Sequence, residues 1–322
     1  MKRSSFPDQR RHGQSSRYST PYRPYDSSQR EELRATAQET LDISRTLLKE
    51  LGTNDLARHS VKYSFDSLTR LHPGHCPSYR QPATIKVIND DTLNAAIELC
   101  HRAQGRDTGP NSQPPIVVNF ANRHSPGGGW LNGAMAQEEA LCYRSSLALS
   151  LNKKHYPLER DEALYSPYAL LMRDDLSSGH EISTLPAREL PVVSALTVAA
   201  LRSPPVRLFT NEPRKDRPRR SSSEVFEKRV FANDRDRDIT KAKMRLCLRM
   251  AARHKHDMLV LGALGCGVYG NPPEDIAHCW LEVLREDEFS GNWWREVWFA
   301  VFDPKNEGNF EIFHQVLDGR QV

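Results

Sequence analysis

The alternation of apolar and polar residues predicts strands and helices that follow one another along most of the chain. Short apolar runs typical of buried strands lie in "TIKVIN" from Thr84, "PPIVVNFAN" from Pro114, "PVVSALTVAALR" from Pro191, "DMLVLG" from Asp257 and "REVWFAVFDP" from Arg295. Apolar residues at helical spacing occupy residues 28–51, 90–104, 136–151, 238–256 and the stretch after Pro273. Strands that alternate with helices predict an α/β domain with a parallel or mixed sheet and helices on both faces.

Two basic segments lack this pattern. Residues 1–28 are rich in Arg, Ser, Pro and Tyr and poor in aliphatic side chains, so we expect a disordered basic tail. Such a tail either contacts nucleic acid or an anionic polymer, or has no specific partner. The stretch "NEPRKDRPRRSSSE" from Asn211, which includes Arg214 and Arg220, predicts a surface loop, with a nuclear import signal or an anion-binding patch as alternatives. Residues 29–322 are expected to form one folded domain, whose N-terminal helical part covers about 29–80.

Composition and charge narrow the class of protein. The chain has 322 residues, enough for one large domain, and its net charge of +4 permits an anionic ligand without requiring one. No apolar stretch has the length of a membrane span and the N-terminus lacks the apolar core of a secretory signal, so neither a membrane partner nor secretion is expected. The six cysteines form no CxxC pair, which argues against a zinc site and a disulfide framework. We therefore expect no metal, and a reducing compartment, the nucleus or the cytoplasm.

Two glycine-rich segments each follow a predicted strand and precede a predicted helix. The first is "PGGG" from Pro126 and the second is "GALGCGVYG" from Gly262. If the two strands are parallel, both segments lie at the carboxyl edge of the sheet, where ligands of such sheets bind. Glycines let the backbone approach a ligand closely and the following helix adds its positive end, so the pair suits a phosphate or diphosphate. Neither segment has a dinucleotide or P-loop fingerprint, and each alone also fits a simple tight turn.

Two adjacent carboxylates, Glu138 and Glu139, begin the helix after the first glycine segment. Acidic residues in a first helical turn complement the helix dipole, and this is one interpretation. The other is chemical, because burial and a nearby diphosphate raise the pKa of a carboxyl group and prepare it to act as a general acid for glycoside cleavage. Successive helical residues point about 100° apart, so one glutamate would act on the scissile bond and the other on a hydroxyl. The spacing does not decide which.

The triple glycine, seven further residues and then Gln137-Glu138-Glu139 resemble the signature of poly(ADP-ribose) glycohydrolases. The preceding "VVNFANRHSPGGG" and the later "LVLGALGCGVYGNPP" are similar to the microbial, or bacterial-type, branch of that family, and the resemblance extends roughly from Ser28 to Leu317. The second segment is shared with macrodomains in general. The resemblance implies a three-layer α/β/α macrodomain-like fold with a mixed central sheet and an added N-terminal helical region.

The resemblance also implies an activity. Such an enzyme hydrolyses the ribose–ribose O-glycosidic bonds of poly(ADP-ribose) and releases ADP-ribose, mainly from chain ends in compact members, without a cofactor. The implied partners are the polymer, ADP-ribose and poly(ADP-ribosyl)ated proteins, with a place in the DNA damage response, and a monomer is expected. The alternatives are a non-catalytic macrodomain that binds ADP-ribose and a hydrolase of mono-ADP-ribosylated acceptors, while direct nucleic-acid binding stays open.

The family pattern assigns individual roles. It implies that Glu139 is the catalytic acid and that Glu138 binds ribose hydroxyls and positions the scissile linkage. It also implies that Asn122 points toward the distal ribose. The other implied substrate-binding residues are Gly127, Gly128, Gly129, Gln137, Gly265, Cys266, Gly267, Val268, Tyr269 and Gly270. At Tyr269 this branch usually has Phe, so the aromatic ring is kept and a hydroxyl is added.

Three further features have a structural interpretation that outweighs a chemical one. Cys266 resembles a nucleophile, but no histidine near it in the sequence would activate it, so it is expected to be a small packing residue. His124 adjoins the first glycine segment and is assigned no catalytic role. The tryptophans of "NWWREVW" from Asn292 are expected in the core rather than under a base.

Overall fold

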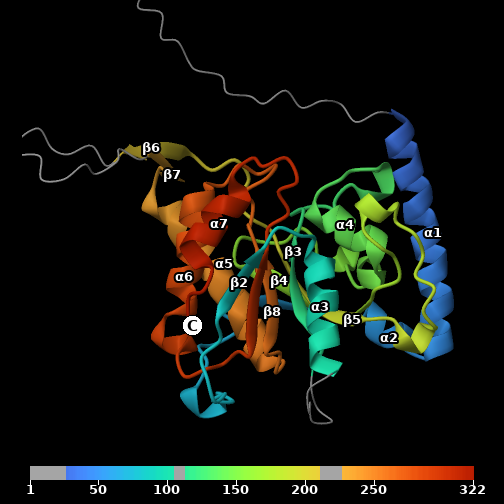
Figure 1. Ribbon diagram of the computed structural model, residues 1–322, viewed down its shortest axis with the longest axis horizontal. Helices are drawn as coiled ribbons and strands as arrows, with labels where there is room; N and C mark the ends of the chain where they lie inside the picture. The colour runs from blue at the N-terminus through green and yellow to red at the C-terminus, as the bar shows by residue number, and fades with distance from the viewer. Residues whose placement is uncertain (1–26, 105–112, 211–226) are drawn as a thin grey trace, which may run out of the picture.

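The computed structural model describes residues 27–104, 113–210 and 227–322 (Figure 1). The basic loop expected at 211–224 and almost all of the expected tail at 1–28 lie outside these residues. Ser27 and Ser28 are the exception, because they are the first residues of helix α1 (Ser27–Leu51). Among the described residues, no helix is both long and apolar enough to cross a membrane.

A seven-stranded mixed sheet forms the centre of the domain, in the order β1-β4-β5-β3-β8-β9-β2. Strands β5, β3, β8, β9 and β2 are mutually parallel, whereas β4 runs antiparallel to β5 and to the edge strand β1. The strands are β1 (Val61–Ser64), β2 (Ile85–Ile88), β3 (Ile116–Phe120), β4 (Glu162–Leu170), β5 (Val192–Val198), β8 (Met258–Gly262) and β9 (Glu296–Ala300). The expectation of a mixed sheet is therefore confirmed.

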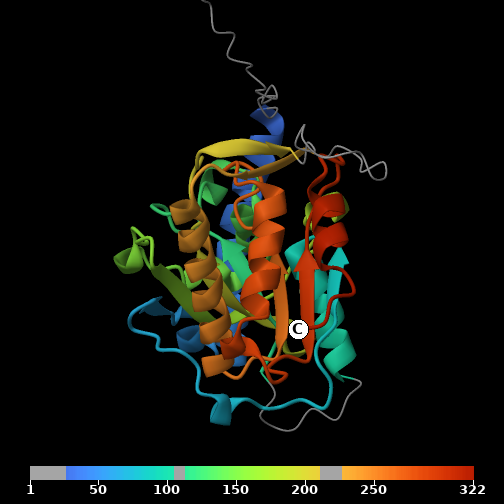
Figure 2. The same ribbon diagram turned by 90° about the vertical axis from the view of Figure 1, so that its left-hand side faces the viewer.

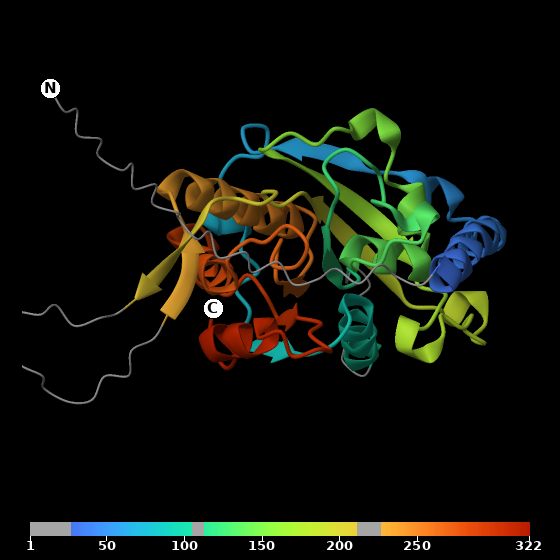
Figure 3. The same ribbon diagram turned by 90° about the horizontal axis from the view of Figure 1, so that it is seen from above.

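Helices cover both faces of this sheet (Figures 1 and 3). One face carries α5 (Asp234–Arg253), α6 (Pro273–Leu284) and α7 (Asn309–Leu317). The other carries α3 (Thr92–Gln104) and α4 (Gln137–Arg144), with α1 and α2 (Asn54–Arg58) at its outer side. Short 3-10 helices occupy connections: η1 (Pro73–His75), η2 (Trp130–Asn132), η3 (Ser146–Leu149), η4 (Lys153–His155), η5 (Leu176–Ser178), η6 (Ala187–Glu189) and η7 (Asp287–Phe289). The three-layer macrodomain-like fold is confirmed.

A separate two-stranded antiparallel ribbon lies outside the main sheet. It consists of β6 (Val206–Thr210) and β7 (Glu227–Phe231), which pair over five residues each. The ribbon lies at the end of the molecule beside α6, near the edge of the sheet where β3 and β8 end (Figures 1 and 2). The apolar pattern did not predict it.

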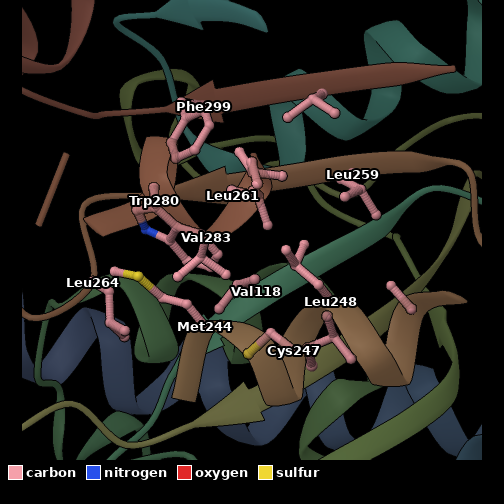
Figure 4. Packing of buried hydrophobic residues seen from close by; sticks show 14 of the residues in the cluster. Val118, Met244, Cys247, Leu248, Leu259, Leu261, Leu264, Trp280, Val283 and Phe299 are labelled. Carbon is pink, nitrogen blue, oxygen red and sulfur yellow. The ribbon is translucent and has the colours of Figure 1, made fainter. Parts of the chain in front are cut away.

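Alternating side chains of the central strands fill two hydrophobic cores, one on each face. Val118, Leu261 and Phe299 point toward the core under α5 and α6, where Figure 4 shows them with Met244, Cys247, Leu248 and Trp280. Their neighbours Val117 and Val260 point toward the core under α3 and α4. Both faces of the strands are apolar because both are covered by helices. All three tryptophans of the stretch from Asn292 are buried, which confirms their core role.

Trp280 ties α6 to the end of β8, so its replacement should weaken this core. The side chain is fully buried and its Nε1 donates to the Gly262 carbonyl oxygen at 3.1 Å. We expect Trp280→Phe to lower the free energy of unfolding by about 2 kcal/mol, since a buried acceptor loses its partner and a cavity remains. Urea unfolding of both proteins measures this difference. Phe310→Leu, in the half-buried rim of the same core, is the matched control and should lose less.

Two expected elements are shorter than the sequence pattern indicated. The helix expected at 136–151 ends at Arg144, because the extended Ser145 donates from its hydroxyl to the Leu141 carbonyl oxygen at 2.7 Å and accepts from the Leu147 N–H at 3.2 Å, which starts η3. The N-terminal helical part expected at about 29–80 ends with α2. Beyond it, Val61–Ser64 is the edge strand β1, and residues 65–82 contain only the short η1.

Candidate active site

Both glycine segments lie at the carboxyl edge of the sheet, as the sequence predicted. Strands β3 and β8, which precede them, are adjacent and parallel, with Ile116 opposite Leu259 and Val117 opposite Val260. The first loop covers residues 121–136 and leads into α4. The second loop covers residues 263–272 and leads into α6. The two loops and the two helix starts therefore flank the same stretch of the sheet edge (Figure 3).

The first loop needs glycine at Gly128 for two separate reasons. Its φ is +60°, a left-handed conformation that side chains disfavour. A Cβ atom at this position would also lie 2.2 Å from Glu139 Oε1 and 3.1 Å from Glu138 Oε2. The backbone of the loop therefore lies directly against both carboxylates, so the sequence spacing does bring the glycines and the acids together.

Glu138 is a buried carboxylate surrounded by nitrogen donors. Its Oε1 accepts from the Gly127 N–H at 3.1 Å and from Asn119 Nδ2 at 3.4 Å, and its Oε2 accepts from the Asn122 N–H at 2.6 Å. Only 2% of the residue is exposed. Burial raises the pKa of Glu138 from 4.5 to about 8, and the negative charge of the neighbouring Glu139 contributes to this rise. The three hydrogen-bond donors lower the pKa but do not offset the rise. One proton is thus held at this pair near neutral pH.

The raised pKa of Glu138 predicts a dependence of stability on pH. Because the folded-state pKa is about 8 and the ordinary value is 4.5, the folded protein binds this proton more tightly than the unfolded chain does. The resulting stabilisation is fully present below 4.5 and is lost as the pH rises to about 8. We expect the free energy of unfolding of Glu138→Gln to change less than that of the wild type between pH 4.5 and about 8. Urea unfolding of both proteins at several pH values measures this difference. An equal slope in both proteins would contradict this prediction.

Glu139 is bound by backbone groups on both sides. Its Oε1 accepts from the Gly129 N–H at 2.8 Å, and its Oε2 accepts from the Ala136 N–H at 3.0 Å. The second bond caps the start of α4, so Glu139 does stabilise the first turn of this helix. Each Glu139 oxygen uses one lone pair within the protein. Glu139 is also more exposed than Glu138, at 7%. It is the carboxylate better placed to meet a substrate.

The two polar side chains expected to bind substrate beside these acids are both engaged within the protein. Asn122 Oδ1 accepts from the His124 and Ser125 N–H groups at 2.9 and 3.1 Å, which turns the loop toward the glycines. Gln137 Oε1 accepts from the Phe120 N–H at 2.8 Å, and its Nε2 donates to the Val118 carbonyl oxygen at 2.7 Å. Gln137 thus fixes α4 to the end of β3. Substrate binding by either residue stays a prediction.

The second loop closes tightly at its base and is open beyond it. Gly265 has φ +75°, and a Cβ there would lie 2.6 Å from Ala200 Cβ and 2.4 Å from Asn271 Nδ2. Asn271 is buried and donates to the Leu201 carbonyl oxygen at 2.7 Å, so this loop packs against the residues after β5. At Gly267 and Gly270 a Cβ would meet nothing within 4 Å. Together with Val268, which is 83% exposed, they leave this stretch of backbone accessible to a ligand.

Tyr269 and Cys266 occupy the middle of the second loop. Burial raises the pKa of Tyr269, and Glu138 and Glu139 raise it further, so its hydroxyl lies in the field of both acids. Burial also raises the pKa of the Cys266 thiol. Cys266 therefore has the properties of a packing residue, as expected, since a nucleophilic cysteine needs a lowered pKa. His124 is exposed on the first loop.

Two residues beside Glu138 were not singled out from the sequence. Asn119 is fully buried at the end of β3, and it donates to Glu138 Oε1 and, at 3.2 Å, to Thr197 Oγ1. The hydroxyl of Tyr156 is buried and has no hydrogen-bond partner in the part of the chain that the structure describes. Burial and then Glu138 raise the pKa of Tyr156. Asn119 stood in the quoted "VVNFAN" run, whereas nothing in the sequence around Tyr156 marks it.

The first part of the chain is similar in sequence to a known family. Residues 25–174 match the family described as "Microbial-type PARG, catalytic domain". The matched range contains the first glycine loop and both glutamates of the poly(ADP-ribose) glycohydrolase (PARG) signature, and the second loop lies beyond it. A comparison with curated protein sequences finds no significant match.

The fold is similar to those of solved bacterial PARG structures. The poly(ADP-ribose) glycohydrolase of Thermomonospora curvata superposes with a TM-score of 0.64 at 24% identity, over 89% of this chain and 99% of that chain. Its form bound to the inhibitor ADP-HPD gives 0.64 at 25% identity, with the same coverage. The enzyme of Deinococcus radiodurans in complex with ADP-ribose gives 0.58 at 24% identity, over 83% and 97% of the two chains. These likenesses extend the PARG fold over nearly the whole chain.

Proposed function

We propose that this protein hydrolyses the ribose–ribose O-glycosidic bonds of poly(ADP-ribose) and releases ADP-ribose. The observation that carries the proposal is the pair of buried glutamates bound by the backbone of a glycine loop, where one added Cβ would touch both. Glycoside hydrolysis uses a carboxyl group that donates a proton and negative charge near an oxocarbenium-like sugar. The bacterial structures of similar fold, one bound to ADP-ribose and one to ADP-HPD, support the same substrate class.

In the proposed reaction the pair supplies one proton and one negative charge. Glu139 delivers the proton to the departing ribose oxygen as the glycosidic bond breaks, because it has a free lone pair on each oxygen and is the more accessible acid. Water then adds to the anomeric carbon and returns a proton to Glu139. Glu138 holds a ribose hydroxyl and fixes the position of the linkage. The hydrogen bonds from Gly127, Gly129 and Asn122 keep both carboxylates oriented before substrate arrives.

The two loops are proposed to hold the rest of an ADP-ribose unit. Glycines 127–129 contact the diphosphate and distal ribose, and the second loop, from Gly265 to Gly270, binds the diphosphate through its open backbone. Asn122 is directed at the distal ribose through its amide nitrogen, since its oxygen is used within the loop. The catalytic unit is proposed to extend over residues 29–322.

Cleavage mainly at chain ends is supported by how α1 packs. A Cβ at Gly133, just beyond the first loop, would lie 2.5 Å from the Arg30 carbonyl oxygen. Thr40 on the same helix donates to the Tyr143 carbonyl oxygen at 2.9 Å. The helix therefore covers the outer side of the first loop and α4, which leaves less room for a polymer to continue past the glutamates. The proposed partners are poly(ADP-ribosyl)ated proteins of the nucleus or cytoplasm. We propose that the protein acts on them as a monomer and without a cofactor.

Release of ADP-ribose from purified polymer tests the proposal directly. We expect ADP-ribose as the main product from unbranched chains. A singly modified acceptor serves as the second substrate, since release from it alone would point to a mono-ADP-ribosyl hydrolase. Tight ADP-ribose binding by calorimetry without product from either substrate would overturn the proposal and indicate a binding module.

A further inference from the structure

The β6–β7 ribbon begins directly beside the second glycine loop. The Ser203 N–H donates to the Tyr269 carbonyl oxygen at 2.8 Å, and Asn271 holds the Leu201 carbonyl oxygen at 2.7 Å. Ala200 packs against Gly265, because a Cβ atom added at Gly265 would lie only 2.6 Å from the Ala200 Cβ. The residues between β5 and β6 are thus in continuous contact with the loop that we assign to the diphosphate. A ligand in that loop would have the ribbon as its neighbour.

The base of the ribbon is fixed, whereas its outer part is exposed. Phe231 is buried, and its N–H donates to Asp275 Oδ2 in the first turn of α6 at 2.7 Å. The Ala232 N–H donates to the Pro205 carbonyl oxygen at 2.9 Å and closes the base. Further out, Leu208 is 63% exposed and Phe209 45% exposed. Five paired residues extend roughly 17 Å, so the ribbon presents a fixed exposed strip rather than a loop.

The charges on this strip are predominantly positive. Arg207 and Arg229 are exposed, and Arg202 lies exposed at the junction with the second loop. None of these three forms an ion pair with another residue that the structure describes. Arg229 opposes the rise that burial causes in the pKa of Cys266, so its guanidinium lies in the field of the second loop. The described strands carry one acidic side chain, Glu227, at the outer end.

We propose that the β6–β7 ribbon binds further ADP-ribose units of the polymer whose end lies in the site. This inference rests on the proposed function. Each unit carries a diphosphate that an exposed arginine suits, and an adenine that an exposed phenylalanine ring stacks on. Arg207 and Phe209 lie on one face of the ribbon, whereas Arg229, which pairs with Leu208, lies on the other. The polymer therefore continues along the face of Arg207 and Phe209, and Arg202 and Arg229 add to the positive charge beside the second loop. The ribbon raises affinity for long chains and leaves the cleavage of the terminal bond to the glutamates.

Binding of long polymer to a catalytically inactive background tests this. Glu139→Gln protein, with and without Arg207→Gln and Arg229→Gln, is titrated with long poly(ADP-ribose) and with ADP-ribose alone. We expect the two substitutions to weaken long-polymer binding about 10-fold at low salt, with a smaller effect as the salt rises, because exposed charges are screened. Binding of ADP-ribose should not change. Phe209→Ala should weaken long-polymer binding without changing its salt dependence.

A matched control removes the same charge elsewhere. Arg188→Gln and Arg320→Gln replace two exposed arginines away from the ribbon and should leave long-polymer binding unaltered. Equal polymer binding by the ribbon variant and this control would overturn the inference. Single-stranded DNA of similar length that competes as well as the polymer would also overturn it, since the ribbon would then be a general nucleic-acid surface. Loss of ADP-ribose binding by the parent protein would instead contradict the proposed function.

Discussion

Glu139→Gln should slow release of ADP-ribose from polymer by about 10²- to 10⁴-fold, because general acid catalysis contributes a factor of that size. The amide cannot supply the proton that the departing ribose oxygen needs. Its single oxygen also cannot accept from both Gly129 and Ala136, whose N–H groups lie at 2.8 and 3.0 Å from the two carboxylate oxygens. We therefore expect a loss of about 1 kcal/mol in stability as well. Initial rates on unbranched polymer and urea unfolding measure the two effects.

Two controls separate the loss of the acid from a general loss of structure. Glu311→Gln removes an acidic residue from the first turn of α7, outside the site, and should keep the wild-type rate. ADP-ribose should still raise the melting temperature of the Glu139→Gln protein, which would show an intact site. Near wild-type turnover by this protein, combined with an inactive Glu138→Gln, would reverse the roles assigned to the two acids.

Gly128→Ala should abolish most activity even though it removes no functional group. A left-handed φ of +60° costs an alanine about 1–2 kcal/mol. The added methyl would also lie 2.2 Å from Glu139 Oε1, so the carboxylate must move. A displacement of about 1 Å at a catalytic group can cost about 10²-fold in rate, and we expect at least that loss.

The matched control separates the clash from the backbone strain. Gly52 has φ +66° and nothing within 4 Å of a Cβ, so Gly52→Ala carries the conformational cost alone. It should lower the melting temperature to a similar extent and leave the rate of ADP-ribose release unchanged. If both variants retain activity, the contact between the glycine loop and the glutamates is not needed for catalysis.

The parallel strands and the two loops could be predicted because their signals are local. Strands β3 and β8 are continuous apolar runs, and a run buried on both faces needs no partner to be recognised. Strand β4 was missed because Pro167 lies within it and the register shifts between Ser166 and Ala169, which interrupts the strand pattern. The ribbon was missed because its exposed strands bury almost no apolar side chain.

For the site, spacing predicted proximity but not orientation. The seven residues between Gly129 and Gln137 do bring the loop onto the acids. The spacing could not predict that Glu138 accepts from three nitrogen donors and Glu139 from two. Nor could it predict that the Gln137 side chain is hydrogen-bonded to β3. These depend on the loop path, which is determined by distant contacts such as that between Gly133 and Arg30.

The place of the β6–β7 ribbon outside the seven-stranded sheet has a consequence for how such a protein can change. Among the described residues, its two strands form hydrogen-bond ladders only with each other, so changing their length or charge disturbs no strand that carries a proposed catalytic loop. Selection on this ribbon can thus proceed independently of selection on the glutamates. Related chains with the same acids and a different ribbon would form a natural series in which bond cleavage is constant and preference for polymer length varies.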